Sequence, residues 1–336
     1  MGDGTKINPY TRDDVVDLLK KRKSERFKFT GKYFIDGIDL SNLDCSQECF
    51  NKARLFRAKF NGSNLEAAEF KECVLDYATF NLGAIGQSKL TGADFQGASL
   101  EHAEFRGANV SVVKFSGDET DGVLVSHPAR FQDTNFLDAD LFRADFKGCF
   151  LYGVKFEGAS LRGSNIFEAH LEDVNWGNFV IGEEKKGEYW FAETVYRRLK
   201  DWYRNAGMED VAGEFFFREM TVRRKRMSWK PNPVHRVWSK LISILCGYGE
   251  RPLRVISSAI VLVLGLAIVY FLSGNLKPDS FLDSLYFSAI SFTALGYGGW
   301  APEPTGWVKW LGVAESFSGV FLMALFLVTF TRKMTR

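Results

Sequence analysis

The segment from Thr293 to Gly299 has residue types that could hold a dehydrated cation through backbone oxygens alone. A site that strips water from a cation must supply oxygens in its place, and backbone carbonyls do this when they face one axis. Successive carbonyls of an extended chain alternate in direction, but Gly296 and Gly298 can adopt positive φ and turn consecutive carbonyls to one side. A second Gly-Tyr-Gly, at 247–249, follows a basic stretch, and nothing gives it a comparable setting.

Two hydrophobic stretches flank this segment, Val255 to Leu272 and Trp307 to Phe330. Each is long enough to cross a bilayer at ~20 residues per span. An aromatic, helix-compatible run, 280–292, lies between the first stretch and the glycines. Irregular backbone is tolerated at membrane depth only where it lines a cavity or is buried in protein. The sequence therefore predicts a membrane domain over 251–336 in which a short helix leads into the glycine-rich segment.

This order of elements resembles the pore of the two-transmembrane potassium-channel family. The family pattern is Thr-Thr-Val-Gly-Tyr-Gly-Asp, and this chain reads Thr-Ala-Leu-Gly-Tyr-Gly-Gly. The resemblance implies an all-α domain with a re-entrant pore helix, and a homotetramer because one chain supplies one loop to the ring. It implies potassium as the permeant ion, no cofactor, and a carbonyl-lined filter at 294–298. The expected ion-binding residues are Thr293, Ala294, Leu295, Gly296, Tyr297 and Gly298.

Two filter positions depart from the family pattern. Ala294 stands where the family has the threonine whose hydroxyl closes the innermost ion site. Gly299 replaces an aspartate at the outer mouth. A weakly selective sodium and potassium channel is therefore an alternative to a potassium channel.

Two residues of the second hydrophobic stretch are further candidates. Gly319 falls close to the family's hinge glycine, although glycine is also common where helices pack. Glu315 is the one acid within this stretch. A carboxyl at that depth is costly and is expected to face protein, where it could support the filter by hydrogen bonds.

Basic residues predict the orientation of the chain. Between Thr221 and Arg254 there are nine Lys or Arg and a single acid, whereas the loop 273–309 has two basic residues. An excess of basic residues marks the cytoplasmic side. We therefore expect a multi-pass protein of the cell membrane with both ends in the cytoplasm. Residues 1–28 have no apolar core, so no signal peptide is predicted.

A four-residue basic run precedes the first hydrophobic stretch. It consists of Arg223, Arg224, Lys225 and Arg226. Such a run could contact anionic lipid headgroups of the bilayer. The alternative is a topological anchor without a specific ligand.

Bulky apolar residues recur at every fifth position through most of the remaining chain. The first set is Leu40, Cys45, Phe50, Leu55, Phe60, Leu65, Phe70, Leu75, Phe80, Ile85, Leu90, Phe95, Leu100, Phe105, Val110 and Phe115. The register resumes one residue later with Phe131, Phe136, Leu141, Phe146, Leu151, Phe156, Leu161, Ile166, Leu171 and Trp176. A small residue, as at Ala53 or Ala98, precedes most of these by two positions. A period of five fits neither an α-helix nor a flat strand.

The five-residue period resembles the pentapeptide-repeat family. The resemblance implies a right-handed quadrilateral β-helix over 34–180, with four repeats per coil and a continuous core of inward residues. We expect a helical cap over 1–33 and a side loop at 116–128. A short α-helical hairpin is expected within a cytoplasmic segment, 185–250. One hairpin cannot bury both faces, so it should pack on the repeats, on a neighbouring subunit, or on both.

No enzyme activity is predicted, because no Ser-His-Asp set, phosphate-binding loop or metal motif is visible. His102 and His170 lack metal-ligand spacing, and the cysteines form no disulfide framework. Residues 34–180 have 22 acidic and 13 basic residues, and some pentapeptide-repeat proteins are acidic DNA mimics. A membrane-tethered acidic binding protein is therefore an alternative of another class. No nucleic-acid partner is expected for the channel, whose repeats would serve as scaffold or sensor for an unknown cytoplasmic regulator.

Overall fold

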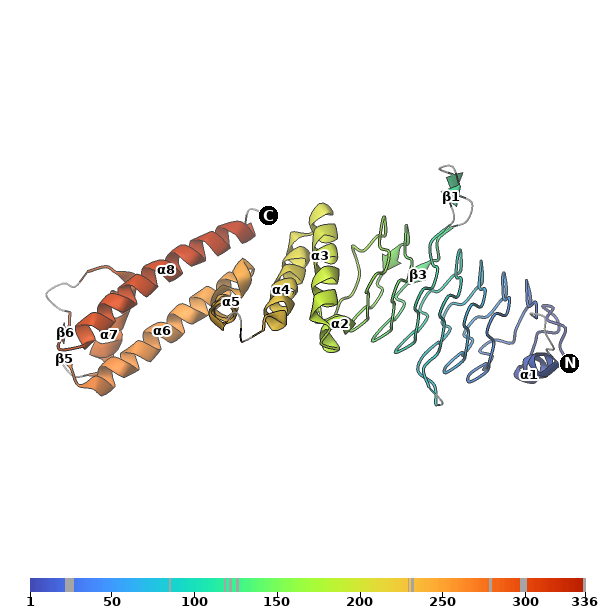
Figure 1. Ribbon diagram of the computed structural model, residues 1–336, viewed down its shortest axis with the longest axis horizontal. Helices are drawn as coiled ribbons and strands as arrows, with labels where there is room; N and C mark the ends of the chain where they lie inside the picture. Colours follow the sequence, from blue (N-terminus) through green and yellow to red (C-terminus); the bar gives the residue numbers. More distant parts are fainter. Residues whose placement is uncertain are drawn as a thin grey trace. The chain divides into compact units, whose positions relative to one another are not determined.

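The computed structural model describes residues 1–21, 27–84, 86–117, 119–120, 123–124, 127–228, 230, 233–277, 280–296 and 301–334. Contacts divide the chain into two compact units, Met1–Arg223 and Arg224–Arg336 (Figure 1). The boundary falls in the last turn of α4 (Glu209–Arg226). The expected single segment 185–250 therefore contributes to both units.

The repeats stack as coils, and each regular coil contains four pentapeptides. Residues 20 apart pair through parallel bridges, as in Asp39 with Lys59 and Lys59 with Thr79. Backbone hydrogen bonds join successive coils, such as Leu40 N to Lys59 O at 2.7 Å. Many corners hold a residue in the left-handed region, including the non-glycine residue Arg57 with φ 56°. That conformation costs ~1–2 kcal/mol for an L-residue, so the stacking of coils must offset it repeatedly.

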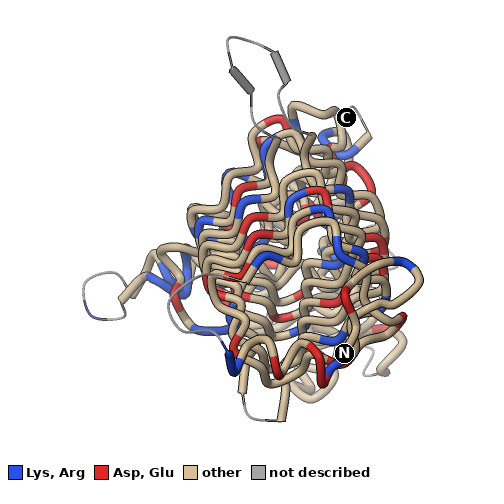
Figure 2. The backbone as a smooth tube through the Cα atoms, turned by 90° about the vertical axis from the view of Figure 1, so that its right-hand side faces the viewer, with Lys and Arg blue, Asp and Glu red and all other residues tan. Residues whose placement is uncertain are grey.

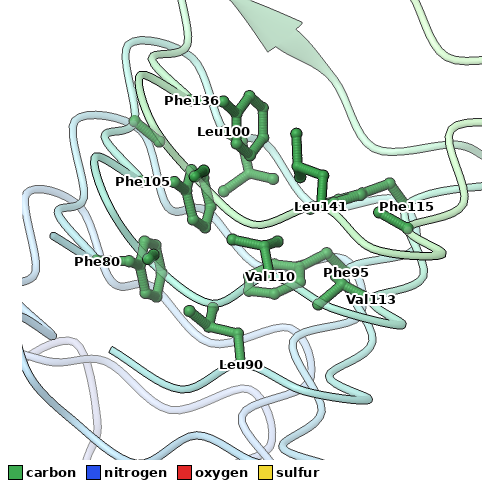
Figure 3. Close-up of a cluster of buried hydrophobic side chains, with 14 of the residues drawn as sticks. Phe80, Leu90, Phe95, Leu100, Phe105, Val110, Val113, Phe115, Phe136 and Leu141 are labelled. Carbon is green, nitrogen blue, oxygen red and sulfur yellow. The ribbon is translucent and has the colours of Figure 1, made fainter. Parts of the chain in front are cut away.

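Phenylalanines form two columns inside the coils (Figure 3). One column contains Phe50, Phe70, Phe95, Phe115 and Phe146, and the other contains Phe60, Phe80, Phe105, Phe136 and Phe156. Neighbouring rings within a column are stacked with centroids 4.7–5.5 Å apart. Rings of the two columns meet edge to face, as between Phe60 and Phe70 at 5.8 Å. The phenylalanines at the large inward positions of the repeats therefore form a buried aromatic core.

The sequence predicts an uninterrupted five-residue register through Ile85, which lies outside the described residues. The pairing between the neighbouring coils differs from that prediction. Asn64 pairs with Lys89 and Thr79 with Glu104, so these coils hold 25 residues instead of 20. Leu82 is exposed just before this point. One pentapeptide is therefore displaced from the stack, and beside it Gly83 N–H donates locally to Gly86 O at 2.8 Å.

The expected interruption at 116–128 is a side loop. Ser99 pairs with Arg130, so the coil contains 31 residues. The loop includes an antiparallel pair, β1 (Glu119–Thr120) and β2 (Val123–Leu124). The coil resumes with β3 (Phe131–Gln132), which is parallel to β4 (Leu151–Tyr152).

Helices cover both ends of the repeat core. At the N-terminal end lies α1 (Arg12–Lys21), whose Val15 is buried against Phe29 and its neighbours. The coils begin before the expected boundary at residue 34, because Lys28 already pairs with Cys49. At the other end lie α2 (Gly182–Lys185), α3 (Tyr189–Asn205) and α4.

The hairpin α3–α4 packs on the last coil. Trp176 stacks on Phe156 and continues one aromatic column. Its Nε1 donates to Tyr203 Oη of α3 at 2.6 Å, and Phe215 of α4 meets its ring edge to face. The apolar face of the hairpin is thus buried within the same cluster as the repeats.

After the last turn of α4, the second unit continues with α5 (Pro233–Cys246), a helix that was not predicted, and the turn η1 (Gly247–Gly249). The helices α6 (Pro252–Ser273) and α8 (Val308–Met334) follow, with mean hydropathy 2.7 and 2.0 in their most apolar windows. Both are long and apolar enough to cross a membrane. The helix α7 (Phe281–Thr293) packs on both. Strands β5 (Leu276–Lys277) and β6 (Glu303–Pro304) pair beside it.

Candidate functional site

The glycine-rich segment follows directly from the C-terminal end of α7. Ala294 ends the helix with φ 54°, and its N–H donates to Ser291 O at 3.2 Å. Gly296 has φ 91°. Positive φ at alternate residues is the conformation expected if neighbouring carbonyls are to face one side. Tyr297 and Gly298, the other expected filter residues, lie outside the described residues.

The side chains of Thr293 and Leu295, at the start of this segment, are both exposed. Thr293 Oγ1 donates back to Ala289 O within α7, at 2.8 Å. Leu295 is 82% exposed in the single chain. Thr293 therefore has its hydroxyl proton engaged by the helix, and Ala294 has no hydroxyl. Residues 294–296 have no side-chain oxygen, so only their backbone carbonyls could contact an ion.

Helix α8 crosses the end of α7 at very close range. A Cβ placed on Gly319 would lie 1.8 Å from Phe292 O, so any larger residue would displace backbone. One turn earlier, Ser316 Oγ donates to Ser291 O at 2.8 Å. The structure thus assigns Gly319 a packing contact with the end of α7, one of the two roles that the sequence left open.

Glu315 joins three helices. Its side chain is buried, and it accepts a hydrogen bond from Tyr270 Oη of α6 at 2.7 Å. Ser288 Oγ of α7 lies within hydrogen-bond distance of both Glu315 Oε1 and Val263 O. Tyr270 also packs edge to face on Phe287 of α7. Glu315 therefore faces protein. Its hydrogen bonds offset the cost of burying a carboxyl in an apolar setting.

The four-residue basic run does not act as one surface. Arg223 Nε donates to Glu193 Oε1 at 3.0 Å, and its Nη2 donates to Glu219 Oε1 at 3.1 Å. Both carboxylates are buried between α3 and α4. Arg223 is therefore part of the hairpin's ion-pair network, and its expected role as a lipid contact stays a prediction. Arg226 is exposed on α4, and Lys225 lies beside α5.

The second Gly-Tyr-Gly is a tight turn that connects α5 to α6. Gly247, Tyr248 and Gly249 all have positive φ, with Tyr248 at 59°. Tyr248 Oη accepts from Arg224 Nη1 at 3.0 Å and lies 3.0 Å from Ser239 Oγ. Sequence reasoning missed this turn because two glycines around a tyrosine were compared only with a filter. Two glycines between helical patterns are themselves a turn signal.

Family models match both units. A model described as ion channel matches residues 258–336, and one described as pentapeptide repeats matches eight copies over 49–82, 86–117 and 129–158. The chain joins pentapeptide repeats to an ion-channel domain. The gaps between the matched repeat segments fall at the displaced pentapeptide and at the side loop. An ion-channel domain with two membrane-capable helices is a membrane domain.

Solved structures similar to this chain are pentapeptide-repeat proteins. One is HetL, involved in heterocyst differentiation regulation in the cyanobacterium Nostoc sp. strain PCC 7120, with 25% identity over 43% of this chain and 70% of that chain, and a TM-score of 0.25. A protein of the Arabidopsis thaliana thylakoid lumen has 29% identity over 36% and 70%, with a TM-score of 0.22. QnrB1, a plasmid-mediated fluoroquinolone resistance protein, has 20% identity over 45% and 77%, with a TM-score of 0.24. No curated protein matches the chain.

Proposed function

We propose that four copies of the chain assemble into a potassium-conducting pore lined by the carbonyls of 294–298. The observation that carries this proposal is the exit from α7, where Ala294 and Gly296 have positive φ between two membrane-capable helices. In this arrangement α7 is a re-entrant pore helix. Its C-terminal end bears the negative end of the helix dipole and points toward the start of the ion path.

The inner end of the filter bears on selectivity. With alanine at 294, the position where the family pattern has threonine supplies no side-chain oxygen to the innermost site. Backbone carbonyls still replace the hydration shell of a cation. A pore that conducts sodium and potassium with weak selectivity is therefore the second candidate.

The repeats serve as scaffold or sensor on the cytoplasmic side. The basic residues of 221–254 and those that end α8, Arg332 and Lys333, support an orientation with both units' soluble parts in the cytoplasm. The plasma membrane is the proposed location.

The charges on the repeats argue against an acidic mimic of nucleic acid. Figure 2 shows Lys and Arg interleaved with Asp and Glu over the coils. Successive coils are joined by ion pairs such as Lys71 with Asp94 at 3.1 Å and Lys52 with Glu72 at 3.5 Å. A mimic of the DNA backbone needs a surface of one sign, whereas these neighbours neutralise one another.

The test is the reversal potential of the purified chain in a planar bilayer with potassium on one side and sodium on the other. A value near the potassium equilibrium potential supports the proposal. A value near zero with clear current supports the weakly selective pore. Absence of current at every potential, with the protein shown to be inserted, would favour a membrane-tethered binding protein.

A further inference from the structure

A hollow opens on the outside of the repeat coils at the point where the side loop rejoins them. Its volume is about 620 Å³, which lies within the range of small-molecule sites. All of its lining residues belong to the repeat unit. The lining of this side-loop hollow includes Glu101, Ala129, Arg130, Phe131, Gln132 and Phe150.

The pairing of β3 with β4 places three of these side chains together. Phe131 of β3 is opposite Leu151 of β4 in parallel register. Side chains alternate along a strand, so Arg130 and Gln132 face outward on either side of the buried Phe131. Phe150 directly precedes Leu151, and it therefore lies beside Arg130 on the next coil.

The polar side chains of the hollow are not used by the fold. Glu101 lies on the coil before that of Arg130, since Ser99 pairs with Arg130. The side chains of Glu101, Arg130 and Gln132 form no hydrogen bond or ion pair with any other residue that the structure describes. Outward charges elsewhere on the coils form ion pairs, as Lys71 does. A cation, an anion and an amide around one hollow are thus available to a ligand.

An exposed aromatic ring forms one wall of the hollow. Phe150 is 61% exposed, and its ring stacks on that of His170 with centroids 4.2 Å apart and planes 3° from parallel. His170 does not line the hollow, so the hollow reaches the part of the Phe150 ring that His170 leaves open. A flat ring supported on one side can stack a further planar ring on the other.

We propose that the side-loop hollow binds a mononucleotide, with its base stacked on Phe150 and its phosphate on Arg130. A guanidinium donates two parallel hydrogen bonds to a phosphate. Gln132 and Glu101 face the edge of the base, because an amide pairs with the amino group and ring nitrogen of adenine and a carboxylate accepts from an amino group.

The occupant is a single nucleotide and not a nucleic-acid strand. Residues 34–180 carry 22 acidic and 13 basic side chains, so the surface around the hollow repels a polyanion. One phosphate group needs only the one cation that Arg130 supplies. The bound nucleotide gives the repeats a ligand to sense, but its binding does not depend on ion conduction.

The test measures binding of radiolabelled adenosine monophosphate to the full chain in detergent, by equilibrium dialysis. Arg130→Gln and Phe150→Ala remove the two main contacts, and both side chains are exposed, so neither substitution should unfold the coils. Arg143→Gln and Phe167→Ala are the matched controls, because both are exposed on the coils and neither lines the hollow.

The unchanged chain should bind adenosine monophosphate saturably, with Kd below about 1 mM. Each hollow variant should weaken binding roughly tenfold, through loss of the stacked base or of the charge-assisted hydrogen bonds. The two controls should leave it unchanged. Absence of saturable binding would overturn the proposal, as would an equal loss in the hollow variants and the controls.

Competitors separate the parts of the ligand. Adenosine should compete less well than adenosine monophosphate against the unchanged chain and equally well against Arg130→Gln, because only the phosphate contacts Arg130. Inorganic phosphate as effective as the nucleotide would mean an adventitious ion only and would overturn the site. Tighter binding of an adenosine oligonucleotide would overturn it in favour of a nucleic-acid surface. These readouts require no ion flux, so the proposed channel can fail without this site failing, and the reverse.

Discussion

Arg332, near the end of α8, pairs with Glu250, in the turn before α6, with Nη2 and Oε1 3.2 Å apart. Glu250 is nearly buried, whereas Arg332 is partly exposed. The pair joins the ends of the two membrane-capable helices that lie on the basic side of the chain. Any outward movement of the end of α8 must break it.

Arg332→Gln is therefore expected to raise the open probability of the reconstituted channel severalfold. Partly exposed ion pairs contribute up to about 1 kcal/mol, which limits the effect. Single-channel recording measures it, with Lys333→Gln as a neighbouring charge control. A double variant with Glu250→Gln should add little to the single one, because both remove the same pair. An additive effect of the two substitutions would contradict the coupling.

Gly319→Ala is expected to damage the channel domain severely. The new Cβ would lie 1.8 Å from Phe292 O, so α7 or α8 must move and the filter with it. Thermal unfolding of the domain in detergent should fall by several degrees, and cation selectivity should be lost. Gly265→Ala is the control, because a Cβ there meets no atom within 4 Å. Equal tolerance of both substitutions would exclude the packing role.

Glu315→Leu should destabilise the channel domain more than Glu315→Gln. Leucine leaves the Tyr270 hydroxyl without its carboxylate acceptor, whereas Ser288 Oγ can still donate to Val263 O; a buried unsatisfied polar group costs ~1–3 kcal/mol. Glutamine keeps one acceptor oxygen, which can accept from Tyr270 while Ser288 donates to Val263 O. Thermal unfolding of the two variants and their potassium-to-sodium permeability ratios measure the difference. If leucine proves as stable as glutamine, the hydrogen bonds do not support α7.

Ala294→Thr should strengthen the preference for potassium. The threonine would restore a hydroxyl at the innermost position of the filter, which the unchanged chain lacks. The reversal potential under bi-ionic conditions should move toward the potassium equilibrium potential. Ala294→Ser supplies a hydroxyl without the extra methyl and should shift it in the same direction, whereas an unmoved reversal potential would remove the inner site from the proposal.

The repeat unit should become more stable at neutral pH when Glu183 is replaced by glutamine. Burial beneath the last coil raises the pKa of Glu183, although Ser160 Oγ and Arg162 N donate to its Oε1. A raised folded-state pKa means that protonation favours the folded state. Stability from this group is therefore full below its unfolded-state pKa and is lost as pH rises toward the folded-state pKa.

Glu183→Gln should accordingly raise the melting temperature of the repeat unit in the full chain at pH 7, because the amide is neutral where burial disfavours a charged carboxylate. The difference between the variant and the unchanged chain should shrink as pH falls through the acidic range. Calorimetry at several pH values measures it. A difference that is constant with pH would show that ionisation of Glu183 is not its cause.

Elements that repeat, or that need only length and hydropathy, are predictable from the sequence. The period of five over Leu40 to Trp176 fits neither an α-helix nor a flat strand, and the resemblance to pentapeptide repeats implies the coils. Two long apolar stretches predict membrane helices, because only length and hydropathy are needed. The positive φ of Gly296 is likewise predictable, because glycine adopts that conformation without a steric cost.

Contacts between side chains that are distant in the chain are seen in the folded structure and not in the sequence pattern. The displaced pentapeptide near Leu82 has the same period as its neighbours, so the sequence pattern does not distinguish it. Its displacement from the stack depends on pairing between residues that are 25 apart in the chain. Arg223 looks like its basic neighbours in the sequence, but buried carboxylates of two helices engage it. Gly319 against Phe292 O, and Glu315 between Tyr270 and Ser288, likewise depend on how α6, α7 and α8 pack. Contacts between residues distant in the chain leave no local pattern, because their partners are selected by packing and not by spacing.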